Sequence, residues 1–502
     1  MKEGTTGMES ETGTRPIAGP DLPRRVVIMG DADAWLAALM LRNLLPQDLV
    51  RLTVCSASGD NGQRLPAFVS TPSLTRTLLQ LGLDEYDLLR ESAGTYRLGT
   101  LYSDWSHEGR DFWVPLGMEQ LSWAAEPLFY LWLSERKAGR LLRPFHAWSP
   151  NWAAALAGKA PHSFSGDAPL GAARGYGFHG DSGRLFSWLK SQAISLGVEE
   201  VAGEILRRFP DGGGGIAQIE VAGHGIVKGD LYLNCIASDD DSCWNEWPWA
   251  AARFAVQRVS NQAAVPPFDR LTGTEYGWKK TVPLVDQTEN LYAFHAAAAD
   301  DAFMQKVIGE SLVPFVLDHS SGCRKQFWEG NQIHIGPAAA RIGLLSDQQF
   351  HVLQAQVEIL LELFPDRRGG RSVAREYNSR VSTMLASIRS ELAVRDLQLR
   401  STARSGEQQR QLEKESAELL DLYDAVGIVE QTSMFAPAAV NLQVFLAGSG
   451  RLPRAATLLR NDPGPEAVQS MMRNLTARNE EITRDLARHE DLLDWIHAGP
   501  LR

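Results

Sequence analysis

The sequence contains few cysteines, and none are paired at metal-binding spacing. Only four cysteines occur among its 502 residues, with no CxxC motif. This scarcity argues against a disulfide framework and gives no support to a cysteine zinc site. We therefore expect a cytoplasmic protein without a bound metal.

The sequence also lacks a surplus of positive charge and a long apolar run. Acidic residues outnumber basic ones by 61 to 50, for a net charge of -11, which argues against a nucleic-acid partner. No apolar run reaches the roughly 18 residues of a membrane span. Residues 1–23 are polar, and we expect a disordered tail without the apolar segment of a secretion signal.

What the sequence does contain begins with a strand–helix–strand pattern. The apolar stretch VVIM (26–29) is followed by a helical pattern at 36–45 and a second apolar strand at about 49–57. This spacing predicts a right-handed crossover and a parallel sheet. Residues 216–238 alternate around glycine turns and predict antiparallel strands that end in the buried strand LYLNCI.

Aromatic and helical segments fill the rest of the chain. Residues 100–155 hold six tryptophans, which either pack a core or line an aromatic substrate cavity. From about residue 370 the pattern becomes helical. We expect the charge-rich stretches at 389–401 and 406–427 to form solvated helix faces.

Several segments, in their order and spacing, resemble the flavin-dependent tryptophan halogenases. The first ones are LGLDEYDLLRESAGTYRLGTLYSDW, GYGFHGDSGRLFSWLKSQAISLGVEEV and DLYLNC. They are followed by GWKKTVPL, SGCRKQFWEGNQIHIGPAAARIGLL, REYNSRV, MFAPAAVNLQVFLAGSGRLP and ARHEDLLDWI. The resemblance spans about residues 24–497.

The resemblance implies an α/β, FAD-monooxygenase-like dinucleotide-binding fold, with a parallel sheet and antiparallel additions. We expect this domain at 24–365, with an aromatic-rich insertion at about 100–170, and a mainly helical C-terminal domain at 366–502. In active members, reduced FAD, oxygen and halide yield hypohalous acid, which reaches a lysine beside the aromatic substrate. A glutamate near that lysine assists the chemistry.

The phosphate-binding loop departs from the family's three glycines. The register places Gly30, Ala32 and Trp35 at those positions, or gives a loop one residue shorter if Trp35 matches the tryptophan after the last glycine. Either register loses two glycines that let the backbone approach a diphosphate. Asp31 and Asp33 stand where an anion would otherwise bind, and we expect both to act as N-caps.

Three further flavin-contacting positions also differ. Cys55 and Ser56 end the second strand, where the family usually has an acidic residue, and Phe68 occupies another acidic position. The segment that reads G-D-A-A-G in the family is Gly336, Pro337 and three alanines, including Ala339. Pro337 removes a carboxylate and an N–H donor. These losses together predict that FAD binding is lost.

The positions that match the catalytic pair are Arg97, for the lysine, and Ser346, for the glutamate. A guanidinium stays charged and is a poor nucleophile, so Arg97 should not replace the lysine, and an ion-pair role explains it more simply. Asp347 and Gln348 replace the halide-binding Ser-Thr pair. We expect the charge of Asp347 to oppose chloride binding.

The tunnel motif WxWxIP is only partly kept. Trp278 and Pro283 remain, while Lys280 replaces the second tryptophan. Lys280 could be a new catalytic lysine, but a solvent-facing lysine explains it with fewer assumptions.

The sequence thus predicts a tryptophan-halogenase-like protein with degraded FAD and halogenation sites. It would be a non-catalytic binding or accessory protein whose partner is an aromatic small molecule or an active halogenase homologue. The alternative is an active flavin-dependent halogenase or monooxygenase that uses reduced FAD from a flavin reductase. A homodimer is left open.

Overall fold

The structure is a computed structural model. It describes residues 25–498 except 57–64, 119–121, 124–125, 165–174, 238–242, 248, 250, 252, 262, 296–297, 299, 310–314, 319–320, 346, 367–369, 431–438 and 456–462. The expected N-terminal tail lies outside the described residues.

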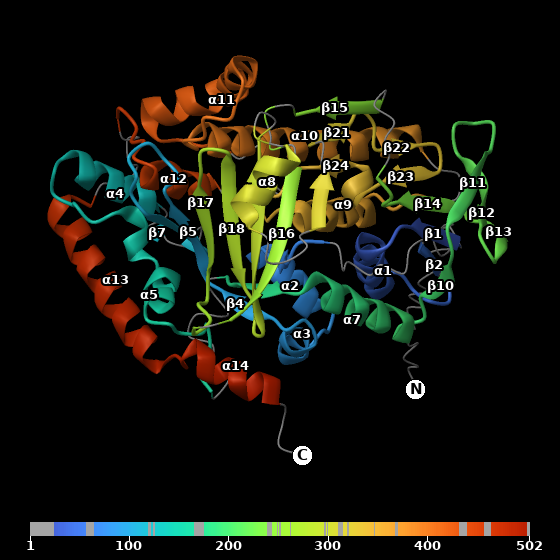
Figure 1. The fold of residues 1–502 in the computed structure, drawn as a ribbon, viewed down its shortest axis with the longest axis horizontal. Coiled ribbons are helices and arrows are strands. Elements are labelled where there is room, and N and C mark those ends of the chain that lie inside the picture. The colour runs from blue at the N-terminus through green and yellow to red at the C-terminus, as the bar shows by residue number, and fades with distance from the viewer. Residues whose placement is uncertain are drawn as a thin grey trace, which may run out of the picture.

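The first large sheet is a dinucleotide-binding sheet at one end of the molecule (Figure 1). Its strand order is β10-β2-β1-β14-β23-β22, and all neighbours are parallel except β22 and β23. The strands are β1 (Arg25–Met29), β2 (Arg51–Ser56), β10 (Glu199–Ala202), β14 (Leu231–Asn234), β22 (Trp328–Glu329) and β23 (Gln332–His334). The predicted parallel pairing of the first two strands is confirmed.

Helices cover one face of this sheet, while Val27 and Met29 on the other face pack against β12 (Ile216–Val221) of a small antiparallel sheet, since β1 is apolar on both faces. Helix α1 (Ala32–Leu44) follows β1 and packs against α7 (Ser182–Ser195) and α9 (Gln349–Glu362). This small antiparallel sheet leads into β14, as the glycine-punctuated pattern predicts. It consists of β11 (Ile205–Pro210), β12 (Ile216–Val221) and β13 (Gly225–Val227).

The second large sheet lies in the middle of the molecule (Figure 1). Its order is β20-β16-β19-β18-β17-β5-β6, mostly antiparallel, with one parallel pair between β17 and β5. Its strands are β5 (Gly99–Ser103), β6 (Phe112–Pro115), β16 (Arg253–Ser260), β17 (Asp269–Gly273), β18 (Gly277–Pro283), β19 (Gln287–Phe294) and β20 (Phe315–Asp318).

A third sheet, of order β3-β9-β4, brings residues from distant parts of the chain next to the central sheet. Its strands are β3 (Phe68–Val69), β4 (Thr95–Arg97) and β9 (Gly177–Gly180). Three shorter helices lie nearby: α2 (Pro72–Gln80), α3 (Glu85–Glu91) and α5 (Pro150–Leu156). Arg97 ends β4 two residues before β5 begins, so it lies where the two sheets meet.

The C-terminal part is helical, as predicted. Its helices are α10 (Arg371–Leu397), α11 (Gly406–Val426), α12 (Ala439–Gly448), α13 (Pro465–Asp485) and α14 (His489–Ala498). The expectation that 389–401 is a solvated face is wrong, because Glu391, Arg395 and Asp396 are buried. Their charges are paired: Arg395 binds Glu391, and Asp396 contacts Arg404.

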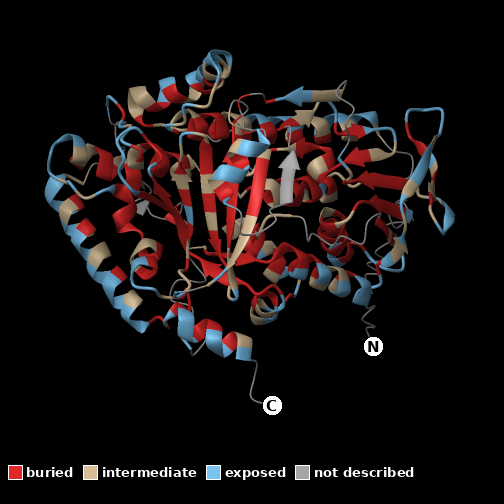
Figure 2. Cartoon of the chain, in the orientation of Figure 1, coloured by how far each residue is buried: buried red, intermediate tan, exposed pale blue. Residues whose placement is uncertain are grey.

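The buried residues follow the two large sheets and the inner faces of the helices, while the outer face of α13 is largely exposed (Figure 2). Four tryptophans of this region are buried and belong to hydrophobic core clusters: Trp105, Trp113, Trp132 and Trp148. This favours the core-packing interpretation of the tryptophan-rich region for these four residues.

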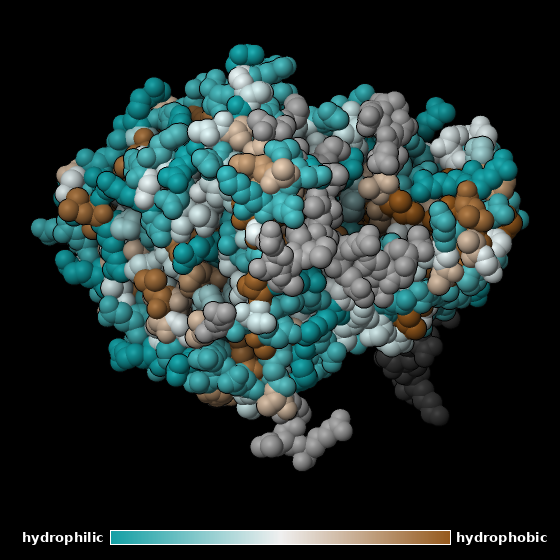
Figure 3. Space-filling view, in the orientation of Figure 1, coloured by the Kyte–Doolittle hydropathy of each residue, from teal (hydrophilic) through white to brown (hydrophobic). Residues whose placement is uncertain are grey.

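The face in Figure 3 is mostly hydrophilic, with apolar side chains in small groups. Among the described residues, no helix is both long and apolar enough to cross a membrane.

Candidate active site

The turn after β1 needs a glycine, although the rest of the phosphate-loop pattern is missing. Gly30 has φ +143°, and a Cβ there would lie 2.8 Å from the Cβ of Cys235. Its N–H donates to the carbonyl of Cys55 at 3.0 Å. Ala32 and Trp35 are buried in the core beneath the sheet. The turn therefore keeps the close approach of two strands with a single glycine.

Asp31 occupies the N-cap position of α1, as predicted, but the predicted capping by its side chain is wrong. Helix α1 begins at Ala32, and Asp31 makes no side-chain cap hydrogen bond. The cause is its backbone, with φ -106° and ψ -112°, outside the extended region from which a cap side chain reaches the free N–H groups.

Asp33 occupies the first turn of α1. Burial raises its pKa to about 7. The negative charge of Asp31 also raises this pKa, whereas a hydrogen bond from the backbone N–H of Asp33 lowers it. Its Oδ1 has no partner among the described residues. A Cβ on Gly336 would lie 3.4 Å from this oxygen. The acid thus lies between the two segments that the resemblance links to flavin.

The second of these segments begins the short helix η5 (Gly336–Ala338). The N–H of Gly336 donates to Oε1 of Gln356, on α9, at 2.8 Å, so it is already satisfied inside the protein. Ala339 is buried. Phe68, at the other altered position, is buried against Phe186 and Phe350. An aromatic cluster therefore replaces the acidic side chain expected from the family.

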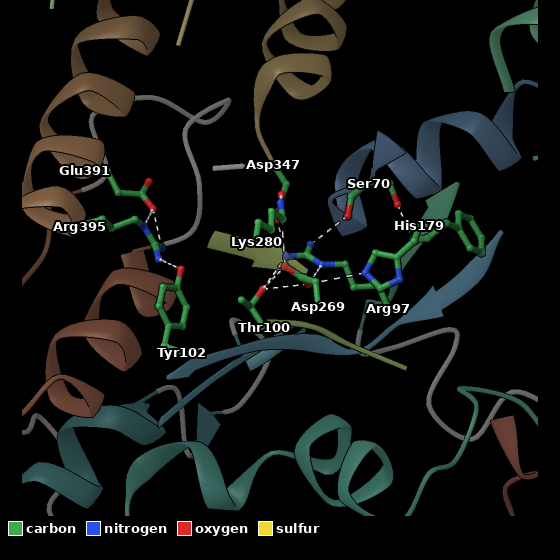
Figure 4. Close-up of polar contacts among 11 residues, drawn as sticks. Ser70, Arg97, Thr100, Tyr102, His179, Asp269, Lys280, Asp347, Glu391 and Arg395 are labelled. Carbon is green, nitrogen blue, oxygen red and sulfur yellow. Dashed lines mark hydrogen bonds and ion pairs between the residues drawn. The ribbon is translucent and has the colours of Figure 1, made fainter. Parts of the chain in front are cut away.

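Arg97 is held by four acceptors (Figure 4). Its Nε donates to Oδ1 of Asp269 at 2.7 Å, and its Nη1 to the carbonyl of Ser70 at 3.1 Å. Its Nη2 donates to Oγ1 of Thr100 at 2.8 Å and to Asp347. The ion-pair interpretation of Arg97 is confirmed. A planar fork donating in fixed directions explains why an arginine suits this position.

Asp269 begins β17 and is fully buried. Burial alone would raise the pKa of its carboxyl, but Arg97, His179 and Lys280 outweigh that effect and hold it well below the usual value. Nε2 of His179, on β9, lies 3.6 Å from Asp269, and its Nδ1 lies 2.9 Å from Oγ1 of Thr95. Burial lowers the pKa of His179 to about 4. The imidazole is therefore neutral near pH 7.

Lys280 is not the solvent-facing lysine that the sequence suggested. It lies in the middle of β18, paired in register with Leu271 and Leu291, and only 4% of its surface is exposed. Its Nζ contacts Oδ1 of Asp347 and lies 4.0 Å from Oδ2 of Asp269. Burial lowers its pKa to about 8; Asp269 and Glu289 act against this shift, and Arg97 adds to it.

Asp347 joins the two cations, because one carboxylate oxygen contacts Arg97 and the other contacts Lys280. We call Arg97, Asp269, Lys280 and Asp347 the cavity cluster. Its two cations balance its two anions, so Asp347 does not present the uncompensated charge that was expected to repel chloride. Ser346, the predicted match for the family glutamate, lies outside the described residues.

An apolar cavity of about 310 Å³ adjoins the cavity cluster. We call it the Lys280 cavity. Lys280 and Asp347 line it together with Asp33 and Pro337, so it connects the cluster with the altered flavin segments. Val69 and Phe350 are among its apolar walls. The predicted tunnel residues Trp278 and Pro283 are buried but do not line it.

Sequence reasoning located Arg97 but missed most of its partners. Asp269 lies in none of the quoted segments and reaches Arg97 only through the pairing of β17 with β5. His179 lies beside Asp269 because β9 pairs with β4. One signal was available: the lone acid in PPFDRLTG follows two prolines and a phenylalanine at the start of a strand, where an unpaired buried carboxylate would be costly.

Comparison with known proteins places this geometry in context. The family model for tryptophan halogenase matches residues 25–463. The tryptophan 6-halogenase SttH of Streptomyces toxytricini is 23% identical over 412 residues, covering 73% of this chain and 77% of that protein. The 7-chloro-L-tryptophan 6-halogenase KtzR of Kutzneria sp. (strain 744) is 22% identical over 413 residues, covering 74% and 78%.

Solved structures share the fold over nearly the whole chain. BrvH, a flavin-dependent halogenase from Brevundimonas sp. BAL3, has a TM-score of 0.82 at 22% identity, covering 94% of this chain and 99% of that one. Xcc4156, a flavin-dependent halogenase from Xanthomonas campestris, has a TM-score of 0.83 at 22% identity, covering 94% and 98%. The predicted fold class is confirmed.

Proposed function

This chain belongs to the tryptophan halogenase family, and from that premise we propose that it has lost the family's halogenation chemistry and instead binds a small ligand in the Lys280 cavity. FAD is the cofactor of this family, and its members depend on a flavin reductase. The observation that carries the proposal is the state of Arg97, whose guanidinium is committed to acceptors inside the protein.

The chemistry of Arg97 supports this loss. In the family, a lysine at the matching position meets the oxidant, and an amine can be a nucleophile there, whereas a guanidinium remains protonated. The guanidinium of Arg97 is also fixed in place, because Asp269 on β17, Thr100 on β5 and Asp347 before α9 all accept hydrogen bonds from it. Turning it toward a substrate would leave the buried Asp269 without its main counter-ion.

The fit of FAD to this chain is poor. Asp33 presents a buried carboxyl oxygen at the start of α1, where free N–H groups would receive the diphosphate. The Gly336 N–H already serves Gln356. Pro337 lines the cavity without a donor. These three features support the proposal that the cavity holds something smaller and less anionic than FAD.

An assay of bromination tests the proposal. The purified protein is supplied with a flavin reductase, FAD, NADH, bromide, oxygen and tryptophan or indole, and an active family member serves as the positive control. We expect no brominated product in the isotope pattern of the mass spectrum. A product whose yield scales with the concentration of this protein would contradict the proposal.

A second candidate function is an active halogenase in which Lys280 supplies the amine that the family's lysine supplies at the position of Arg97. One observation favours it: Nζ of Lys280 shares the carboxylate of Asp347 with Arg97, so an amine lies beside the family's lysine position. If this candidate were right, the wild type would give product and Lys280→Arg would abolish it. A bromination assay of Lys280→Arg beside the wild type therefore separates the two candidates.

A further inference from the structure

We propose that Lys280 is a nucleophilic amine that binds a carbonyl ligand covalently, as an iminium, in the Lys280 cavity. The proposal rests on the proposed function in one respect, because the cavity must hold a small ligand in place of flavin. It goes further by naming the bonding atom and the chemical class of the ligand.

The first support is the position of the amine. Lys280 extends from the central strand β18 into a mainly apolar cavity, and it is the only lysine among the lining residues, which also include Asp33, Glu289, Arg341 and Asp347. Its side chain is 5% exposed. The preceding residue, Lys279, provides a contrast. It points to the opposite side of the strand, and its Nζ lies 5.3 Å from the centre of the Tyr292 ring.

The second support is the charge around the amine. A lysine becomes nucleophilic near neutral pH when it is desolvated and lies beside another cation. Lys280 is buried, and the guanidinium of Arg97 lowers its pKa, while the carboxylates of Asp269 and Glu289 act in the opposite direction. Its pKa falls to about 8, chiefly through burial. The titratable and charged groups facing it come from five elements or loops: Arg97, His179, Asp269, Glu289 and Asp347.

The third support is that the cavity cluster suits the product. The ammonium first gives a proton to Asp347, and the neutral nitrogen then bonds to the carbonyl carbon. The carbonyl oxygen takes that proton back together with one from nitrogen and leaves as water, so an ammonium and a carbonyl become an iminium and water. Total charge is unchanged, and the iminium keeps Asp347 and Asp269 as counter-ions.

The cavity walls limit the rest of the ligand. A volume of about 310 Å³, with Val69, Leu291 and Phe350 among the walls, suits a compact apolar or aromatic aldehyde or ketone. Asp33, on the same cavity, offers a buried oxygen without a partner among the described residues. A hydroxyl or N–H on the ligand would satisfy it.

Reductive trapping tests the proposal on the full-length protein. Benzaldehyde and sodium cyanoborohydride are added near pH 7, and peptide mass spectrometry locates the benzyl label after a short reaction. We expect Lys280 to be labelled at least roughly tenfold more than a lysine of ordinary pKa, because the neutral fraction of an amine rises about tenfold for each unit by which its pKa falls. Lys280 should also be labelled more than Lys279, whose pKa burial lowers too but which does not line the cavity. Labelling should rise further as the pH passes 8 and level off about one unit above that value, where most of the amine is neutral.

Two variants control this experiment. Lys280→Arg keeps a cation for Asp347 but cannot form an imine, so the dominant label should vanish while circular dichroism stays unchanged. Lys279→Arg should leave the label at Lys280 intact. Equal labelling of Lys279 and Lys280, labelling confined to exposed lysines, or no label on Lys280 would each overturn the proposal.

The outcomes also separate this inference from the proposed function. If Lys280 is not labelled and bromination is also absent, the covalent inference fails while the loss of halogenation stands. If bromination occurs, the proposed function fails whatever the trapping shows.

Discussion

Two buried ion clusters lie near β5, and they differ in what surrounds them (Figure 4). The helix cluster consists of Glu391, Arg395 and Tyr102: Arg395 donates twice to Oε1 of Glu391, at 2.9 and 2.8 Å, and once to the Tyr102 hydroxyl at 2.9 Å. Its guanidinium also lies 4.8 Å from the centre of the Phe445 ring. The cavity cluster has similar charges but borders open space at Lys280.

The difference separates a structural role from a chemical one. In the helix cluster the cation contacts Glu391, the Tyr102 hydroxyl and the Phe445 ring, so its contribution is to fix α10 against β5. In the cavity cluster, Lys280 can lose a proton or gain a ligand without leaving a void or a stranded carboxylate, since Arg97 stays with both acids. A buried charged group therefore does not by itself identify a functional site. A buried charged group that borders a cavity is a better indicator of one.

The largest expected effect comes from breaking the helix cluster. Arg395→Met should lower the free energy of unfolding by about 3–5 kcal/mol, because it leaves Glu391 buried without its partner. Urea denaturation followed by circular dichroism measures this loss. Arg400→Met is the matched control: its contact with Asp104, at 3.7 Å, is exposed and should contribute at most about 1 kcal/mol. Equal shifts for the two variants would contradict the structural role.

Replacing Asp33, which lines the Lys280 cavity, should raise the free energy of unfolding, whereas Arg395→Met lowers it. Because the folded-state pKa of Asp33 is about 7, above the ordinary value of 3.8 for an aspartate, the folded state keeps a proton that the unfolded state releases. Stability is therefore fully present below pH 4 and falls as pH rises toward 7. Asp33→Asn should stabilise the protein by up to about 4 kcal/mol at pH 8 and have little effect at pH 4. A gain of the same size at both pH values would show that titration of Asp33 is not the cause.

A direct counterpart to Arg395→Met is Lys280→Met. We expect it to lower the free energy of unfolding by about 1.5–3 kcal/mol, less than Arg395→Met, because Asp347 keeps Arg97 as its counter-ion. The same urea titration compares the two variants. A loss at Lys280 that exceeds the loss at Arg395 would remove the distinction between the clusters.

The smallest expected effect is on catalysis. Arg97→Lys, alone or with Ser346→Glu, should yield no brominated tryptophan while the phosphate loop carries Asp31, Asp33 and Trp35, since the oxidant requires bound reduced flavin. The measurement is the isotope pattern of the product under the bromination conditions. Product from Arg97→Lys alone would mean that flavin binds, and the account of the first loop would be wrong.

Much of the fold could be predicted because it depends on local patterns. The strand VVIM and the helix after it are apolar at the spacings that their structures require, and β1 and α1 form there. The alternating stretch before LYLNCI likewise gives β12 and β13, and LYLNCI itself gives β14. The division into domains at residue 365 stays a prediction.

The site was less predictable because its contacts join distant parts of the chain. Arg97 meets an acid 172 residues away and another 250 residues away, and no local pattern encodes such pairs. Lys280 was misjudged for the same reason: β18 is central only because β17 and β19 flank it. Arg395 was misjudged because a charged helix face looks the same in sequence whether water or Tyr102 covers it.

The measurement that tests the central claim most directly is a titration of the purified protein with FAD and with reduced FAD, followed by tryptophan fluorescence. The account predicts no saturable quenching at micromolar concentrations, because Asp33 and the occupied N–H of Gly336 oppose the cofactor. Lys280→Met should titrate as the wild type does. Saturable quenching with a low-micromolar dissociation constant, competed by ADP, would contradict the claim.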